Sequence, residues 1–554
     1  MTGDEQHWFV EALDAFRRGD LDTALNSAAR AVAAGSQPEP RHLLGVVWCR
    51  LGQPGRGIEP LRAAASARPD DRNYQLILAR ALIDCGRSDE VLAMPEPAAD
   101  AGAMWLARAE AADRSARPDC AIAAWRAIVA ADAADLRAQL ALARTLAQCD
   151  RFDESVPAYE AVLAADPANS VAFAELAMLF ERCSRIDRLE ALVSAAERSG
   201  MADEALAFPR AQLAFREGDI SGAKGQLERS GPDSDPVSWY RLKSRIEDRL
   251  GNPSEAFSAA RAMKLAAPDR DNWRSRARDY RVHLRRQAET LTPEWADRLR
   301  PLDPFPERNP VFLLGFPRSG TTLLDTFLMG HPKVTVVEER PMLVEATQAI
   351  ANFGALASAN PAELRAARGA YGARLREAPP GGRPVVIDKF PLNLVAAPLI
   401  HALFPGAPII FAKRHPCDPV LSGFMQAFAP NVGMASFLDL ADAADFFDAA
   451  MALWFRSCEV LPLNVHEIAF EDLVADPEAA LRPLVGFLGL DWDPAMLDHR
   501  TAAAARGVIP NTSYDQVTEA LSLNPVFRWR RYRQQLDPVL PVLLPWAKRL
   551  GYIE

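Results

Sequence analysis

A spacing close to 34 residues runs through the first half of this 554-residue chain. A small residue is followed five positions later by a second small or apolar residue, and the pair recurs with little drift. The pairs are Gly19/Ala24, Gly52/Gly57, Gly86/Val91, Ala116/Ala121, Asp150/Ser155, Ser184/Leu189, Gly218/Ala223 and Gly251/Ala256. The sequence between them is rich in Ala, Leu and Arg and has helical periodicity. A period of ~34 with regular breaks predicts stacked helix pairs and disfavours a coiled coil, whose period is 7.

This half of the chain resembles the tetratricopeptide repeat family, with about eight repeats over residues 7 to 275. The first member of each pair is expected at the turn that ends the first helix of a repeat, and the second where the next helix packs closely. The third repeat looks degenerate, because Pro95 and Pro97 fall inside its second helix. The resemblance implies a superhelix whose concave face commonly holds a peptide or a partner protein. A scaffold or dimerisation surface without a ligand fits the sequence equally well.

A proline-rich stretch separates this array from the second half of the chain. Its prolines are Pro301, Pro304, Pro306 and Pro310. Proline at this density ends helices and marks boundaries. We therefore expect a repeat array over 1–285, a linker or capping segment over 286–309 and a second domain over 310–554. His283 and the arginines near it are expected to be solvated surface.

The second domain opens on a short strand, a glycine-bounded loop and a helix. Val311 to Leu314 is an apolar run too short for a helix, Gly315 and Gly320 bound the loop, and a helical pattern resumes at Leu323. Backbone N–H groups and the positive end of the helix dipole would face an anion here. The G-x-x-x-x-G spacing is that of a P-loop, but Thr321 stands in the position of its lysine. We expect a phosphate-containing ligand without the lysine-and-magnesium handling of a γ-phosphate.

Further short apolar runs predict a parallel sheet covered on both faces by helices. They span residues 334–337, 385–387, 409–412 and, more weakly, 464–468, with helical patterns between them. Charged residues stand where three of these runs stop. They are Glu338, Glu339, Asp388, Lys389, Lys413 and Arg414. Because parallel strands end at a common edge where ligands bind, these residues and Arg318 predict a phosphate-facing pocket.

Composition argues against several classes of protein. The net charge of −10 argues against a general nucleic-acid binder, and no run approaches the ~20 apolar residues of a membrane span. The first residues lack the basic segment and apolar core of a signal peptide. The seven cysteines form no C-x-x-C pair and no zinc spacing, so we expect small buried fillers, a reducing cytoplasm and no metal.

Several motifs of the second half, in order, resemble those of PAPS-dependent sulfotransferases. They are PRSGTTLL, HP-x-V with EE, DK-x-P-x-N and FPGAPIIFAKRHPCDPVLSGF. The resemblance covers about residues 308 to 540 and is to the bacterial tetratricopeptide-fused sulfotransferases and the related tyrosylprotein sulfotransferases. It implies the donor 3′-phosphoadenosine 5′-phosphosulfate (PAPS), with a 5′-phosphate and a singly charged sulfuryl group. Such a donor has no β/γ-phosphate bridge that needs lysine and magnesium, which fits the threonine at position 321.

The resemblance also implies roles for individual residues. The loop that holds the 5′-phosphosulfate would be Arg318, Ser319, Gly320, Thr321 and Thr322. Arg414 and Ser422 would hold the 3′-phosphate, although His415 stands where the family has aspartate. Glu339 would be the general base and Lys389 would face the leaving oxygen. Arg318 would also neutralise charge on the transferring group.

The C-terminal tail gives a weaker match. Ser513, within NTSYDQV, is a candidate contact of the donor, and Thr518 stands where the relatives have Lys or Arg. The arginine-rich stretch over 528–533 has two interpretations. It supplies replacement charge near the pocket, or it is an amphipathic helix with solvated arginines that buries Trp529, Tyr532 and Leu536.

Three hypotheses follow for the whole chain. The leading one is a sulfotransferase that moves the sulfuryl group of PAPS to an acceptor hydroxyl, leaves adenosine 3′,5′-bisphosphate (PAP), and uses the array to recruit a peptide, protein or glycan. A peptide tyrosine is one acceptor among several, and the oligomeric state, homo-oligomers included, is open. A P-loop nucleotide phosphotransferase is disfavoured by Thr321. A catalytically silent scaffold is disfavoured by the presence of Arg318, Glu339, Lys389 and Arg414 together.

Overall fold

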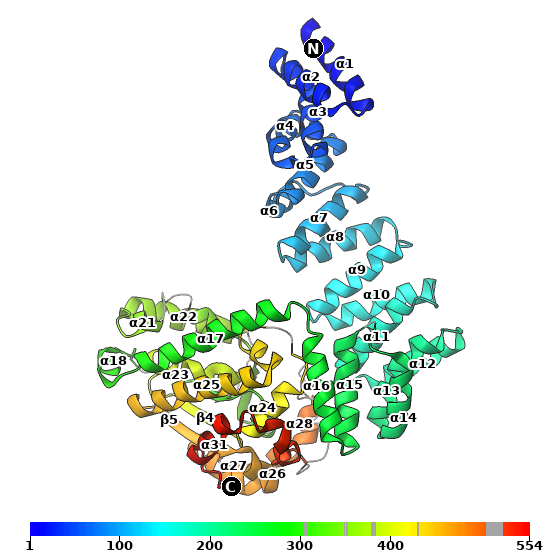
Figure 1. Cartoon of the computed structure of the whole chain (residues 1–554). Coiled ribbons are helices and arrows are strands. Elements are labelled where there is room, and N and C mark those ends of the chain that lie inside the picture. Colours follow the sequence, from blue (N-terminus) through cyan, green and yellow to red (C-terminus); the bar gives the residue numbers. More distant parts are fainter. Residues whose placement is uncertain are drawn as a thin grey trace. The chain divides into compact units, whose positions relative to one another are not determined.

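The computed structural model describes residues 1–233, 235–303, 309–347, 350, 353–377, 384–428, 431–505 and 524–553. Helices make up the first half, and a sheet with flanking helices makes up most of the second half (Figure 1). The chain divides into two compact units, Met1–Pro209 and Arg210–Glu554. The second unit begins well before residue 286. The functional boundaries at 286 and 310 stay a prediction, because packing units and functional domains need not coincide.

The first half consists of consecutive helix pairs. They are α1 (Gly3–Arg17) with α2 (Leu21–Ala34), α3 (Pro38–Arg50) with α4 (Pro54–Ala67), α5 (Arg72–Asp84) with α6 (Ser88–Leu92), α7 (Gly102–Arg114) with α8 (Pro118–Ala131), α9 (Leu136–Gln148) with α10 (Phe152–Ala165), α11 (Ser170–Arg182) with α12 (Ile186–Arg198), α13 (Asp203–Glu217) with α14 (Ile220–Ser230), and α15 (Pro236–Arg249) with α16 (Pro253–Leu265). The prediction of an all-helical repeat array is confirmed.

The turn within each pair lies where the spacing predicts it. The first member of every predicted pair has a left-handed backbone, with φ between 51° and 88°. Five of these positions are glycine, which adopts such a φ without strain, and Ala116, Asp150 and Ser184 adopt it as non-glycine residues. The second members are all buried. At Gly57, for example, a Cβ would lie 2.7 Å from the carbonyl oxygen of Gly45, so the two helices touch through their backbones.

Two details of the array differ from the expectation. The second helix of the third repeat ends at Leu92, so Pro95 and Pro97 follow it and do not lie inside it. Proline cannot donate the backbone hydrogen bond that a longer helix would need. The cysteines are also less uniform than buried fillers would be, because Cys183 and Cys417 are buried, Cys458 is exposed and the others are intermediate.

The second unit contains a five-stranded parallel sheet. Its strands are β1 (Val311–Gly315), β2 (Val334–Glu338), β3 (Val385–Lys389), β4 (Pro408–Lys413) and β5 (Asn464–Ala469), in the order β2-β3-β1-β4-β5. All neighbouring pairs are parallel, and Leu313 lies opposite both Lys389 of β3 and Ile410 of β4. The predicted α/β fold is therefore confirmed, and β1 with its loop occupies the centre of the sheet.

Alternate residues of each strand enter two different hydrophobic cores. Phe312 and Leu314 pack with α22 (Pro361–Glu377), α23 (Ala397–Leu403) and α25 (Leu440–Val460). Val311 and Leu313 pack on the other face. The helices of that face are α19 (Thr321–Met329), α26 (Phe470–Ala475) and α27 (Pro477–Phe487). The remaining elements are α18 (Pro293–Arg298), α20 (Met342–Thr347), α21 (Phe353–Leu356), η1 (Pro391–Ala396), α24 (Cys417–Phe424), η2 (Met434–Leu438), η3 (Pro494–Leu497), α28 (His499–Ala505), η4 (Arg528–Tyr532), α30 (Arg533–Leu536) and α31 (Leu540–Arg549).

The long helix α17 (Arg270–Thr290) is fixed to α25 by ion pairs. Arg281 is only 3% exposed, and its guanidinium lies 2.8 Å from Asp442 and 2.6 Å from Asp445. Arg285 pairs with Asp445 and Asp448. The expectation of solvated surface is confirmed for His283, Arg278 and Arg286, which are exposed. It is wrong for Arg281 and Arg285, because acidic residues of α25 lie opposite them.

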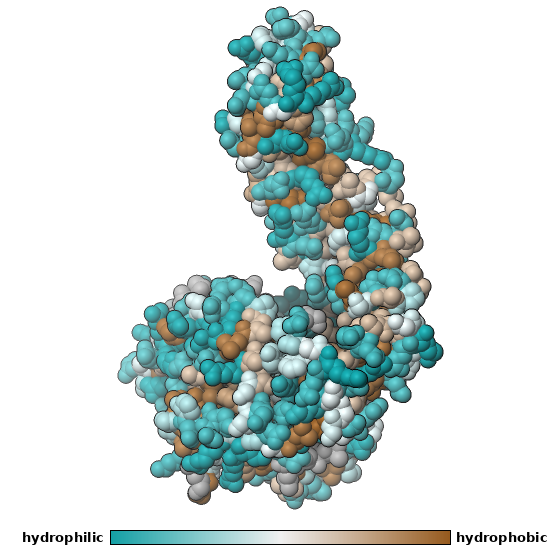
Figure 2. All heavy atoms as spheres, turned by 45° about the vertical axis from the view of Figure 1, so that its right-hand side comes forward, coloured by the Kyte–Doolittle hydropathy of each residue, from teal (hydrophilic) through white to brown (hydrophobic). Residues whose placement is uncertain are grey.

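Hydrophilic residues cover most of the face seen in Figure 2, and hydrophobic residues reach it in separate patches. Among the helices that the structure describes, none combines the length and the apolar character needed to cross a bilayer.

Candidate active site

The loop between β1 and α19 has a strained backbone. Arg318 has φ +73° and Gly320 has φ +89°, both in the left-handed region. A Cβ on Gly320 would lie 2.3 Å from the ring of Phe470, so only glycine fits there. The loop then leads into the first turn of α19, where Thr321 and Thr322 are buried. The first N–H groups of a helix have no partner within it, so this turn presents donors to an anion.

Lys389, the last residue of β3, is completely buried beside three carboxylates. Its Nζ lies 2.7 Å from Glu339 Oε1 and 3.1 Å from Glu338 Oε1. Asp325 Oδ2, on α19, is 3.4 Å away, and so is the hydroxyl of Thr322. Burial lowers the pKa of Lys389, but the three carboxylates outweigh it and raise the pKa above its ordinary value. The lysine is therefore held as a cation, with its charge directed at the loop that follows β2.

Glu339 is the one of these carboxylates that a second molecule can reach. Its side chain is 45% exposed, compared with 15% for Glu338 and none for Asp325. Its φ is +46°, and its N–H donates to the carbonyl of Lys389 at 2.8 Å. A left-handed glutamate is uncommon, and such strained residues concentrate at functional sites.

Two arginines, Arg414 buried and Arg318 partly buried, meet on the other side of the loop. Arg318 Nε donates to the hydroxyl of Ser422, on α24, at 3.1 Å. Arg414 Nη1 donates to the carbonyl of Arg318 at 3.0 Å, and its guanidinium lies over the ring of Phe470, 4.3 Å from the centroid. Burial first, and the nearby Arg414 next, lower the pKa of Arg318 to about 10. Like charges in a buried site repel, and a bound anion would relieve that repulsion.

Unused donors point to the same conclusion. Among the described residues, Nε of Arg414 and Nε of Arg528 are buried without a hydrogen-bond partner. Arg528 begins η4, and its charge contributes to lowering the pKa of both Arg318 and Arg414. Buried donors are nearly always satisfied, so these groups fit a ligand with several anionic oxygens. The residues present thus suit an anionic ligand with several oxygen atoms.

His415, which stands where the family has aspartate, is held in place in the loop after β4 by two neighbours. Its N–H donates to Glu471 Oε1 at 3.0 Å, and its ring stacks on Trp529 with centroids 4.9 Å apart. Burial, together with the charges of Arg530 and Arg414, lowers the pKa of His415 from 6.5 to about 4. The histidine is therefore neutral at pH 7 and packs the arginine-rich tail against the loop after β4.

The structure separates some of the residues that the strand ends group together. Asp388 points to the opposite face of the sheet from Lys389, where the hydroxyl of Tyr371 donates to it at 3.0 Å. Burial raises the pKa of Asp388 to about 7. Lys413 pairs with Glu467 of β5 at 2.8 Å. Ser513 and Thr518 lie outside the described residues.

The amphipathic interpretation of the tail holds for its apolar residues. Trp529, Tyr532 and Leu536 are buried, while Arg530, Arg531 and Arg533 are exposed. Arg528 is the exception, because it is partly buried and electrostatically coupled to the loop arginines.

Comparison with known proteins finds relatives for part of the second unit. The model of the sulfotransferase family matches residues 310–494. An uncharacterised protein of Aquifex aeolicus is 28% identical over 286 residues, which are 49% of this chain and 37% of that protein. Protein-tyrosine sulfotransferase A of Caenorhabditis elegans is 27% identical over 265 residues, 44% of this chain and 67% of that protein.

A solved sulfotransferase domain, from the Synechococcus PCC 7002 olefin synthase, is also similar to this chain. It is 21% identical and covers 42% of this chain and 91% of its own, with a TM-score of 0.30. A TM-score this low adds nothing to the assignment. The present chain spans only about a third of the length of the Aquifex aeolicus protein, so activity and substrates do not pass directly from relative to chain.

The sequence did not single out three residues that contribute to this site. Asp325 forms an ion pair with Lys389. Phe470 contacts both Gly320 and Arg414. The charge of Arg528 acts on Arg318. Asp325 has a signal in the sequence, because it lies one helical turn after Thr321 and so on the same face of α19. Phe470 and Arg528 have none, since they come from distant segments.

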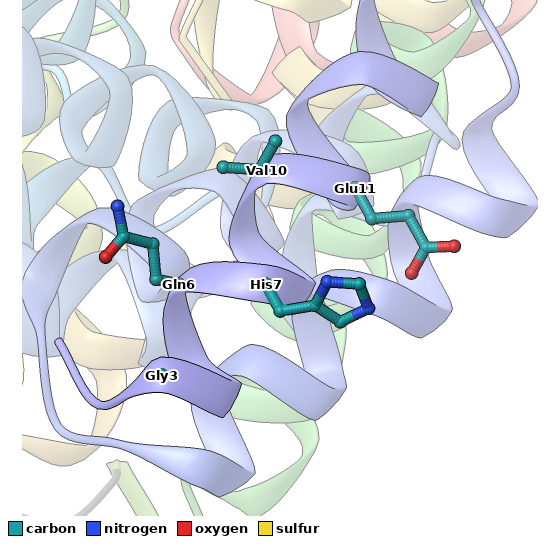
Figure 3. A pocket seen from close by; sticks show the side chains of 5 residues that line it. All are labelled: Gly3, Gln6, His7, Val10 and Glu11. Carbon is teal, nitrogen blue, oxygen red and sulfur yellow. The ribbon is translucent and has the colours of Figure 1, made fainter.

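Two further features of the described residues bear on the search for a ligand site. The described residues contain no group of three or more His, Cys, Asp or Glu side chains arranged to hold a metal ion. A hollow on α1 is lined by Gly3, Gln6, His7, Val10 and Glu11 (Figure 3). These side chains come from a single helix and include no arginine or lysine, so the hollow does not suit an anionic donor.

Proposed function

We propose that this protein is a PAPS-dependent sulfotransferase that transfers the sulfuryl group to an acceptor hydroxyl. The observation that carries the proposal is the pair Glu339 and Lys389, 2.7 Å apart, beside the anion-binding loop of a sulfotransferase-family domain. One member can accept a proton and the other can stabilise negative charge. The same edge of the sheet holds Arg318 and Arg414 for the anionic part of the donor.

PAPS supplies an activated sulfuryl group and a phosphate leaving group. Glu339 accepts the proton of the acceptor hydroxyl as that oxygen bonds to sulfur, a role worth typically ~10²–10⁴ in rate. Lys389 and Arg318 stabilise the charge that builds on the bridging oxygen as the S–O bond to phosphate breaks. The products are the sulfated acceptor, PAP and the proton on Glu339, which is then returned to solvent. None of these roles calls for a metal.

The two phosphates of the donor suit two different parts of the site. The first turn of α19, with Ser319, Thr321 and Thr322, suits the 5′-phosphate. Arg414 and Ser422 suit the 3′-phosphate, because a guanidinium and a hydroxyl both contact Arg318 there and can share one anion. Ser513 stays a candidate contact from the tail.

The acceptor class is inferred from the relatives and the array. Several relatives bear the name protein-tyrosine sulfotransferase, from Caenorhabditis elegans and Danio rerio for example. Helical repeat arrays commonly bind peptides and proteins along an extended face. We infer that a peptide or protein hydroxyl, tyrosine first, is the acceptor, and that the array recruits it.

The experiment is to incubate the purified protein with ³⁵S-labelled PAPS and host lysate, with and without a magnesium chelator, and to identify the labelled species. Label transfer that survives chelation is expected. A parallel incubation with γ-³²P-ATP tests the phosphotransferase alternative, and transfer of phosphate in place of sulfate would overturn the proposal. Calorimetry with PAP tests the silent-scaffold alternative, which predicts no binding.

A further inference from the structure

The carboxylate of Asp248 contacts three residues of the arginine-rich tail and so connects the last helix pair of the array to it. Asp248, near the end of α15, lies 3.1 Å from Arg528 and 3.3 Å from Arg531, and it accepts a hydrogen bond from the hydroxyl of Tyr532. Its side chain is 20% exposed. A second bond runs from Gln535 to Ser254, at 3.1 Å. The tail thus rests on the repeat, within one compact unit.

The other side of the same tail reaches the arginines of the site. The N–H of Trp529 donates to Asp418 at 2.8 Å, and its ring stacks on His415, the residue after Arg414. Arg528, which precedes Trp529, is close enough to lower the pKa of Arg318 and Arg414. Asp248 therefore holds Arg528, and the charge of Arg528 acts on both Arg318 and Arg414.

The partner helix of the repeat contacts the neighbouring helix of the site. Lys264, on α16, is 5% exposed and donates to the carbonyl of Gln426, just after α24. Ala256 and Ala260 of α16 belong to the same hydrophobic core as Val420 and Leu421 of α24. Since α24 carries Ser422, the last repeat packs against two of the segments that form the donor side of the site.

From these contacts we infer that Asp248 is a positioning residue for the donor site, so that the last helical repeat helps to build the sulfotransferase centre. The inference rests on the proposed function, because it assigns Arg528 to an anionic donor. The charge of Arg528 acts unfavourably on Arg318 and Arg414, and two carboxylates offset it: Asp248, 3.1 Å from Arg528, and Asp418, 3.9 Å from Arg414. Asp248 supplies its carboxylate from outside the pocket, where it does not compete with the donor.

The direction in which Asp248→Asn changes the affinity for PAP distinguishes a positioning role from a simple charge effect. Asp248→Asn makes the surroundings of the site more positive by one charge. Through-space attraction alone would then tighten the binding of PAP, which is an anion. Loss of positioning predicts the opposite, because Arg528 loses its charge-assisted bonds and turns away from the other two arginines.

The test is calorimetric titration of the full-length protein with PAP. D248N is expected to weaken binding about tenfold, the size of one lost charge-assisted hydrogen bond. D248E, which keeps the carboxylate, is expected to restore part of the affinity. E255Q is the matched control, because Glu255 is an exposed acid on the neighbouring helix with the same charge change. With PAPS as substrate, KM should rise in D248N while kcat changes less than about twofold, since binding and not chemistry is affected.

Hydrogen exchange gives a readout that does not depend on the donor. The amides of residues 528–532 are expected to exchange faster in D248N than in the wild type, and unchanged in E255Q. Y532F removes one bond to Asp248 without altering charge, and serves if D248N folds poorly. Unchanged or tighter PAP binding in D248N, or unchanged exchange in the tail, would overturn the inference. Failure of the wild type to bind PAP would instead overturn the proposed function.

Discussion

Arg318 and Glu339 share a backbone conformation that their side chains make costly. Both have positive φ without being glycine, and each costs on the order of 1–2 kcal/mol relative to the right-handed region. The two strained residues lie on either side of Lys389 at the edge of the sheet. Surrounding contacts must therefore impose these conformations, which aim one side chain at Ser422 and the other at Lys389.

Replacing Glu339 by Gln tests the assignment of the general base. The amide cannot accept the proton, so kcat is expected to fall ~10²–10⁴-fold while the affinity for PAP changes little. Steady-state kinetics and calorimetry on the same preparation measure both quantities. Glu338→Gln is the control, because Glu338 also contacts Lys389 but is mostly buried, and a smaller loss of kcat is expected. A Glu339→Gln enzyme with the wild-type kcat would remove Glu339 from the mechanism.

Replacing His415 by Phe tests a pH dependence of stability. The pKa of His415 falls from 6.5 to about 4 on folding, so between these values the unfolded chain binds more protons than the folded one. This contribution is present above pH 6.5 and is lost as pH falls through 4, by up to ~3 kcal/mol in the free energy of unfolding.

The substitution keeps the aromatic contact with Trp529 and removes the titration. Urea unfolding at pH 7 and at pH 4.5 is expected to show a larger loss of stability in the wild type than in H415F. Asp388 acts in the opposite direction, because its raised pKa stabilises the folded state as pH falls below 7, but it does so in both proteins. Equal losses in the two proteins would exclude His415 as a source of acid sensitivity.

The sequence predicted the strand-end residues of the site because parallel strands end at one edge. It could not say which side of the sheet each side chain takes. Asp388 and Lys389 are adjacent in sequence and therefore face opposite sides, and only Lys389 joins Glu339. Asp248 and Phe470 were out of reach, since their contacts join segments far apart in the chain.

At the scale of the elements, the loop and helix after β1 depend on one close approach. Gly320 combines a left-handed φ with a ring of Phe470 where its side chain would be. This is why the helix α19 can begin directly against α26. The apolar runs predicted the three central strands β1, β3 and β4 for a related reason, since these are mostly buried on both faces and need no polar alternation. The edge strand β5 is largely exposed or half-buried, which is why its apolar run is weaker.

Replacing Gly320 by Ala is expected to destabilise the second unit by roughly 2–4 kcal/mol, from the left-handed backbone and the clash with Phe470 together. It should also weaken PAP binding, because the first turn of α19 must shift. Chemical denaturation and calorimetry measure the two effects. Gly486→Ala in α27 is the matched control, since a Cβ there meets nothing within 4 Å and a gain of about 1 kcal/mol is expected. A stable Gly320→Ala protein with normal PAP affinity would contradict this account.

At the scale of the whole molecule, α17, which follows the array's last helix pair, is fixed to α25 through arginine–aspartate pairs. Replacing Arg281 by Met removes the buried cation that Asp442 and Asp445 share, although Asp442 keeps Arg274 and Asp445 keeps Arg285. The free energy of unfolding of the second unit is expected to fall by about 2–4 kcal/mol, less than for a fully buried pair because Asp445 is partly exposed.

Thermal and chemical unfolding measure the loss. Arg286→Met provides the comparison, because Arg286 lies on the exposed side of the same helix, and a change of less than about 0.5 kcal/mol is expected there. Similar effects of the two substitutions would mean that the ion pairs contribute nothing specific. The sequence predicted a helix at α17 but could not predict the ion pairs of Arg281. The aspartates that pair with it are more than 150 residues away in the chain.

The three repeat turns that lack glycine have a practical consequence. Ala116, Asp150 and Ser184 occupy consecutive repeats in the middle of the array and each keeps a left-handed backbone that glycine would adopt freely. Glycine at these turns would relieve the strain of the left-handed backbone at the cost of a more flexible unfolded chain, and it would leave the surface side chains of the array almost unchanged. Substitution of Ala116, Asp150 or Ser184 by Gly therefore changes the backbone of the array at three defined turns. The effect of that change on turnover with large acceptors can be measured separately from the effect of changes in surface side chains.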